Sequence, residues 1–117
     1  MKFMIFFNHV QGVWEGLDEA ARARNQRASA KLMTDLATEK KAKLIFFAPP
    51  GDARTVRQHP DGSQEVLNGP SRPGPEQAGG YFLIEAGSMD EAVEWAQRGR
   101  FLTGSNEVRQ IIEFPTS

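Results

Sequence analysis

The sequence predicts an α+β fold in which an antiparallel sheet carries two helices on one face. The segments run in the order strand, long helix, strand, hairpin, strand, short helix, strand, which matches a ferredoxin-like arrangement with an added β-hairpin. The chain has 117 residues, of which 39% are hydrophobic and 25% charged. That length and composition are typical of one soluble globular domain, here residues 1–117.

A short strand and a long helix form the N-terminal part. Residues 2–7, KFMIFF, are rich in β-formers and end at the turn-like Asn8, and two glycines in residues 9–16 indicate a loop. Residues 18–42 lack Gly and Pro, and their apolar side chains recur at spacings of three and four, which predicts an amphipathic helix. This apolar stripe consists of Ala21, Ala28, Leu32, Met33, Leu36 and Ala37. The charges that complement the helix dipole are Asp18 and Glu19 at its start and Lys40, Lys41 and Lys43 near its end.

A second strand and a hairpin follow the long helix. Residues 43–48, KLIFFA, form a strand that stops at the Pro-Pro-Gly of 49–51. Residues 53–58 and 64–67 are predicted to pair around a turn at 60–63, PDGS. Proline fixes φ in such a turn, and glycine tolerates positive φ.

The C-terminal part contains a proline-rich loop, a strand, a short helix and a last strand. We expect the loop at 68–79 to border a pocket near a subunit interface, because loops held by rigid elements often carry binding residues. A strand at 80–86 comes next. Ser88 followed by Glu91 is a capping box, which predicts a helix over 89–98 that ends at Gly99. The alternation in residues 106–114, NEVRQIIEF, predicts the final strand.

The strands predict a homodimer. The apolar runs KFMIFF, KLIFF and YFLI do not alternate with polar residues, so both faces of the sheet should be buried. Two helices cover one face, and the chain has no further segments that could cover the other. We therefore expect a second copy to pack there, sheet against sheet.

Composition excludes several classes of function. The formal net charge of −1 and pI of about 6.1 give no basic surface for nucleic acid. No apolar run approaches the roughly 20 residues that cross a bilayer, and the N-terminus lacks a signal-peptide pattern. These features predict a cytoplasmic protein that binds neither membrane nor nucleic acid. The absence of cysteine excludes disulfides, thiol nucleophiles and cysteine-ligated metals.

Residues 44–112 resemble a known family. The stretches TVRQHPDGSQEVLNGP, GGYFLIEAGSMDEAVEWAQR and NEVRQI follow one another at the spacing of the YCII-related family, and particularly of its DGPF branch. The resemblance implies a ferredoxin-like protomer that forms a dimeric α+β barrel. It also implies a contextual link to extracytoplasmic-function sigma factors.

Two departures from the family pattern restrict what the resemblance implies about chemistry. The acidic residue and the phenylalanine of the D-G-P-F loop are replaced by Asn68 and Ser71. Members of the YCII type carry a histidine on the long helix, proposed as half of a His-Asp acid-base pair. This chain has no histidine between residues 10 and 58, so that role has no counterpart on its helix.

Three residues are candidates for catalysis. His9 follows the first strand, and imidazole is the usual acid-base group at neutral pH. Glu85 and Arg109 lie on strands predicted to be near each other, where they could hold a carbonyl or anionic ligand. Equally, His9 could be a loop residue at the surface, and the charged residues, with Glu107, could form a salt bridge at the sheet edge. The expected ligand-binding residues are Trp14, Tyr81 and Asn68.

No metal or cofactor is expected. The two histidines, His9 and His59, show no metal-ligand spacing. Three functions stay open. The first is cofactor-independent catalysis of the isomerase, lyase or hydrolase kind in a small-molecule pocket. The second is a non-catalytic module that senses a ligand or binds a partner. The third is a heme-free monooxygenase, which rests on fold analogy alone.

Overall fold

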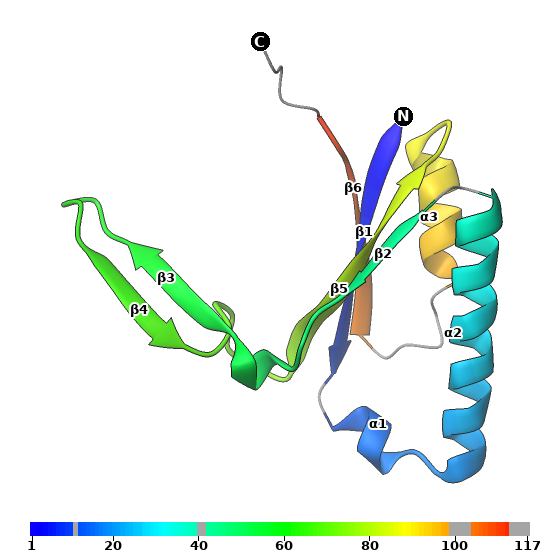
Figure 1. The fold of residues 1–117 in the computed structure, drawn as a ribbon, viewed down its shortest axis with the longest axis horizontal. Coiled ribbons are helices and arrows are strands. Elements are labelled where there is room, and N and C mark those ends of the chain that lie inside the picture. Colours follow the sequence, from blue (N-terminus) through cyan, green and yellow to red (C-terminus); the bar gives the residue numbers. More distant parts are fainter. Residues whose placement is uncertain (11, 40–41, 99–103, 113–117) are drawn as a thin grey trace.

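A computed structural model describes residues 1–10, 12–39, 42–98 and 104–112. A four-stranded antiparallel sheet has the strand order β2-β5-β1-β6, and a separate two-stranded hairpin pairs β3 with β4 (Figure 1). The strands are β1 (Lys2–Val10), β2 (Lys43–Phe46), β3 (Arg54–Gln58), β4 (Gln64–Asn68), β5 (Glu76–Glu85) and β6 (Gly104–Gln110). The helices are α1 (Val13–Gly16), α2 (Glu19–Glu39) and α3 (Met89–Gln97), with a 3-10 turn at Pro50–Asp52.

The predicted fold class is confirmed. Helices α2 and α3 lie on one side of the sheet, and the hairpin projects on the other side (Figure 1). The strand order and the antiparallel pairing are those of the ferredoxin-like plan. Assembly into a dimeric barrel stays a prediction.

The core lies between the sheet and the helices α2 and α3. Phe3, Ile5 and Phe7 alternate along β1 and are almost fully buried, because every second side chain of a strand points to the same face. The other buried apolar residues are Leu32 and Leu36 on α2, Phe82 and Ile84 on β5, Ala86, and Ala92, Trp95 and Ala96 on α3. Of the predicted stripe on α2, Ala28 and Ala37 are exposed instead, so the buried face of this helix is narrower than the stripe.

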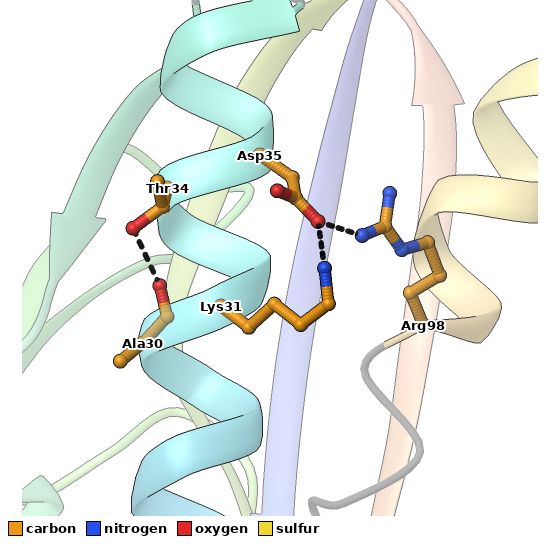
Figure 2. A network of polar contacts seen from close by, with 5 residues as sticks. All are labelled: Ala30, Lys31, Thr34, Asp35 and Arg98. Carbon is orange, nitrogen blue, oxygen red and sulfur yellow. Dashed lines mark hydrogen bonds and ion pairs between the residues drawn. The ribbon is translucent and has the colours of Figure 1, made fainter.

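A polar contact joins α2 to α3 beside this core (Figure 2). The carboxylate of Asp35 accepts a hydrogen bond from Nζ of Lys31 at 3.1 Å, and a second from the guanidinium of Arg98. Arg98 also lies over the ring of Trp95, 4.5 Å from its centroid. The hydrogen bond from Lys31 and then that from Arg98 hold the pKa of Asp35 below its ordinary value of 3.8.

The predicted starts of both long helices are close to the observed ones. Asp18 precedes α2 and accepts a hydrogen bond from the backbone N–H of Ala21 at 2.7 Å, so it acts as the N-cap rather than as the first helical residue. Ser88 caps α3 as predicted, because its Oγ accepts from the backbone N–H of Glu91 at 3.1 Å. The predicted helix end at Gly99 and the lysines at 40–41 lie outside the described residues.

Several predicted boundaries are wrong, among them the end of β2, which is Phe46 rather than residue 48, and the start of β6, which is Gly104 rather than residue 106. Strand β1 extends to Val10 and a short helix, α1, follows it, whereas the sequence predicts a strand that ends at Asn8 and a loop over residues 9–16. Strand β5 begins at Glu76 rather than at residue 80, since Glu76, Gln77 and Ala78 pair with the same extension of β1. Strand β6 ends at Gln110, and Ile111 and Ile112 lie beyond it; residues 113–114 of the predicted strand are outside the described residues.

Candidate functional site

A cleft of about 450 Å³ lies between the end of β1, the helix α1 and the N-terminal half of α2. Its walls are mostly apolar, and its volume is in the range of small-molecule sites. The residues that line it are His9, Val10, Val13, Trp14, Leu17, Asn25, Gln26, Ser29, Ala30 and Met33.

The cleft exists because α2 changes character along its length. Leu32 and Leu36 anchor the C-terminal half of the helix in the core. One and two turns earlier, the same side of the helix carries Ser29 and Asn25, which are half-buried and line the cleft. Small polar side chains do not fill the space between helix and sheet as leucines do, so the core stops and an open volume begins.

Arg22 holds α1 as the floor of the cleft. Its Nε donates to the carbonyl oxygen of Trp14 at 3.1 Å, and its Nη2 donates to that of Glu15 at 2.9 Å. The guanidinium carbon lies 5.8 Å from the centroid of the Trp14 ring. One side chain of α2 therefore satisfies two carbonyls of a one-turn helix and positions the indole at the cleft.

His9 enters the cleft from the sheet. It has the same parity along β1 as the buried Phe7, so its ring lies on the helix side of the sheet. Opposite it, a Cβ on Gly79 would lie 2.8 Å from Nδ1 of His9, so the glycine leaves room for the imidazole. Among the described residues no side chain is hydrogen bonded to this ring, which leaves its nitrogens available to a ligand.

The strand pairing gives Asn8 the opposite orientation, toward a second and more polar cleft of about 690 Å³. The proline-rich loop and the start of β5 border this cleft through Ser71, Arg72, Pro73, Glu76 and Ala78. Ser105 Oγ donates to Glu76 Oε1 at 2.5 Å, and Glu107 pairs with Arg109 at 2.5 Å. The expectation that the loop borders a pocket thus has a structural counterpart, over a loop shortened to residues 69–75.

The structure brings two of the six predicted site residues together, since His9 and Trp14 line one cleft. Arg109 lies at the second cleft, on the opposite face of the sheet. Glu85 pairs with Lys2 at one end of β1, whereas His9 pairs with Gln77 near the other end, about 23 Å along the strand. The remaining two are apart from both: Tyr81 contacts Phe6 and Phe47, and Asn68 ends β4.

Sequence reasoning did not single out Asn25, Gln26 or Ser29. The signal that could have found them is a four-residue spacing, in which Asn25 and Ser29 precede Met33 on one side of the helix. Within the described part of the chain, no three His, Cys, Asp or Glu side chains gather as metal ligands would. In the same residues, every helix is too short or too polar to span a lipid bilayer.

Fold and cleft together define a small ferredoxin-like α+β protein with a ligand-sized cavity beside its sheet. The chain belongs to the YCII-related domain family, whose model matches residues 1–115. A search of curated proteins found no match.

A solved structure with a similar fold is 5-chloro-2-hydroxyhydroquinone dehydrochlorinase from Burkholderia phenoliruptrix AC1100, in complex with 2,5-dihydroxybenzoquinone. The TM-score is 0.51 and the sequence identity is 16%, over 97% of this chain and 96% of that chain. A likeness at this identity establishes a shared fold.

Proposed function

We propose that the cleft beside α1 binds a small planar organic molecule, and that His9 transfers protons there without a cofactor. The observation that carries the proposal is the presence of His9 and Trp14 in one mostly apolar cleft of about 450 Å³. A ring-shaped ligand is further supported by the similar fold of a dehydrochlorinase that binds 2,5-dihydroxybenzoquinone.

Each wall of the cleft has a distinct task in this proposal. The indole of Trp14 stacks on the face of the ligand ring, and Val13 and Met33 contribute apolar surface. Asn25 and Ser29 offer amide and hydroxyl groups to the ligand's oxygens. The imidazolium of His9 donates a proton to the ring carbon that bears the leaving group, which makes that carbon tetrahedral as one hydroxyl becomes a carbonyl. The neutral imidazole then accepts the proton of a second ring hydroxyl, and the electron pair left on that oxygen forms the second carbonyl as the anion departs, so the product is a quinone. That is a lyase step, one of the three reaction classes that the sequence leaves open.

Binding and turnover of two named compounds test the proposal. By titration calorimetry, wild type should bind 2,5-dihydroxybenzoquinone, and Trp14→Ala should weaken binding at least about tenfold through loss of the stacking surface. With 5-chloro-2-hydroxyhydroquinone, His9→Gln should reduce chloride release by about a hundredfold or more. The matched control is His59→Gln, because His59 lies in the hairpin and contacts Glu65 at 2.7 Å.

The outcomes separate the functions that stay open. Binding without turnover by wild type favours the non-catalytic module that senses a ligand, with the sigma-factor link supported by family resemblance alone. Equal binding by wild type and Trp14→Ala would contradict the assignment of the cleft. Retention of full turnover in His9→Gln would contradict the role of the imidazole.

We also infer a homodimer of the DGPF branch. The branch is supported by the order of the motifs from Thr55 to Arg109, including Asn68-Gly69-Pro70 in place of D-G-P. The homodimer is supported by the face of the sheet that lies away from the helices, here called the open sheet face. Its central residues, all apolar or aromatic and only half-buried, are Met4, Phe6, Ile45, Tyr81 and Leu83.

A further inference from the structure

The hairpin of β3 and β4 lies apart from the rest of the molecule. It leaves the sheet near the end of β2 and projects on the side opposite the helices (Figure 1). The radius of gyration is 16.6 Å, whereas a compact chain of this length has roughly 13 Å. The hairpin therefore extends the protomer well beyond its core.

The base and the tip of the hairpin are both well defined. At the base, the backbone N–H of Gly69 donates to the carbonyl of Ala53 at 2.6 Å, and Thr55 Oγ1 donates to the carbonyl of Gly69 at 2.9 Å. At the tip, the predicted turn is present: His59 N–H donates to Ser63 at 2.9 Å, and Gly62 has a φ of 90°. These hydrogen bonds fix the register of β3 and β4, so the hairpin, here called the arm, has a defined structure.

The middle of the arm carries an unusual pair. Val56 and Val66 face each other across the two strands, and 54% and 66% of their surfaces are exposed. A lone two-stranded hairpin is marginally stable in water, and one cross-strand pair of valines adds only modest stability. The pair would be buried if another surface packed on the arm.

We propose that this hairpin is a clasp that packs on a second copy of the same chain. The arm and the open sheet face lie on the same side of the protomer (Figure 1). A second copy stacked on that face, at the roughly 10 Å separation of packed sheets, lies next to the arm. Under two-fold symmetry each arm packs on the other copy, so both Val56–Val66 pairs and both open sheet faces are buried in one interface.

The clasp rests on the proposed homodimer, and the experiment separates the two. Dimer dissociation is measured by sedimentation for wild type and for the double variant Val56→Thr/Val66→Thr, which retains β-branched side chains. The variant should raise the dissociation constant at least about tenfold, because four buried valines per dimer become polar. Val93→Thr, at a partly exposed site of α3 beside β6, is the matched control and should leave the constant unchanged.

Hydrogen exchange of residues 54–68 gives a second readout. These amides should exchange more slowly at concentrations where the dimer forms than after dilution to monomer. A dimer whose dissociation constant is the same in the double variant, and whose arm amides exchange equally at both concentrations, overturns the clasp but leaves the homodimer intact. A wild-type chain that stays monomeric at all concentrations overturns both.

Discussion

Gly79 and Gly80 show how single residues position the candidate site. Both lie on β5, where Gly80 pairs with Phe7 and Ala78 pairs with Asn8. The register with β1 therefore shifts at Gly79, which has no partner of its own on β1. A Cβ on Gly79 would approach only side chains, Phe7 Cε2 at 2.6 Å and His9 Nδ1 at 2.8 Å. A Cβ on Gly80 would lie 2.2 Å from the carbonyl oxygen of Ile45, at a φ of +153° that residues with side chains rarely adopt.

The two glycines should therefore respond differently to alanine. Gly80→Ala should lower the free energy of unfolding by about 3 kcal/mol, because the backbone of β2 cannot move aside without breaking the sheet. Gly79→Ala should cost less stability but weaken binding of 2,5-dihydroxybenzoquinone, since the new methyl group displaces the His9 ring. Urea unfolding and calorimetry measure the two effects.

Gly51→Ala is the control for both substitutions, because a Cβ there meets nothing within 4 Å. It should leave stability and binding close to wild type. If Gly79→Ala binds the quinone as tightly as Gly51→Ala does, the ring of His9 does not contact the ligand.

At the scale of elements, the contact between α2 and α3 gives a pH dependence. The lowered pKa of Asp35 means that its carboxylate stabilises the folded state at pH values above the ordinary value of 3.8. This stabilisation is lost as the pH falls through the lower folded-state pKa. Asp35→Asn should therefore have a slightly lower Tm than wild type at pH 7, and the difference should shrink as the pH falls below 3.8.

Thermal unfolding of both proteins from pH 7 to pH 3 measures this difference. Glu94→Gln, which removes an exposed carboxylate from α3, serves as the control and should show a smaller offset in Tm at pH 7. An offset for Asp35→Asn that stays constant to the lowest pH would show that the ion pair with Lys31 and Arg98 is not its source.

The elements were more predictable from the sequence than their ends were. Local signals predict the positions of α3 and the hairpin turn, because the side chain of Ser88 and the backbone of Gly62 form hydrogen bonds with near neighbours. The extra length of β1 and β5 had no such signal. Those residues are strands because they pair with each other, 68 positions apart at His9 and Gln77, and single-sequence patterns do not report such pairing.

The candidate site shows the same limit. His9 and Trp14 could be singled out by residue type, and only the fold shows that they share a cleft. The sequence predicts that the strands of Glu85 and Arg109 are near one another, but strand proximity does not determine position along a strand or the face of the sheet. The sequence does not show that Asn25 and Ser29 face the sheet, because the alanines of the predicted apolar stripe fit several helix faces equally well.

At the scale of the whole molecule, the shape is that of one layer of helices on one layer of sheet. The longest extent, 49 Å, runs from the hairpin to the helices (Figure 1). An aromatic cluster lies on the open sheet face around Tyr81. The centroid of its ring is 6.1 Å from that of Phe6 and 6.0 Å from that of Phe47. Aromatic side chains in such a cluster contribute most of the energy of an interface when they are buried.

Leu83 gives the sharpest test of assembly through this face. It is half-buried and pairs with Met4 on β1 and Lys43 on β2, so a glutamate there places a carboxylate on the open sheet face with Lys43 beside it. In a protomer alone, Leu83→Glu can extend into water and should change Tm little. In a sheet-to-sheet dimer it buries two carboxylates, each together with its neighbouring Lys43. Because the desolvation of such pairs can exceed their mutual attraction, the protein should shift to monomer by light scattering. Val93→Glu on α3 places the same charge outside the expected interface and should remain dimeric.

Because dimerisation stabilises the folded state by mass action, the Tm of wild type should also rise with protein concentration, while the Tm of Leu83→Glu should stay constant. If Leu83→Glu has the same mass and the same concentration dependence of Tm as wild type, the second copy does not pack on the open sheet face, and some other surface must explain any dimer that forms.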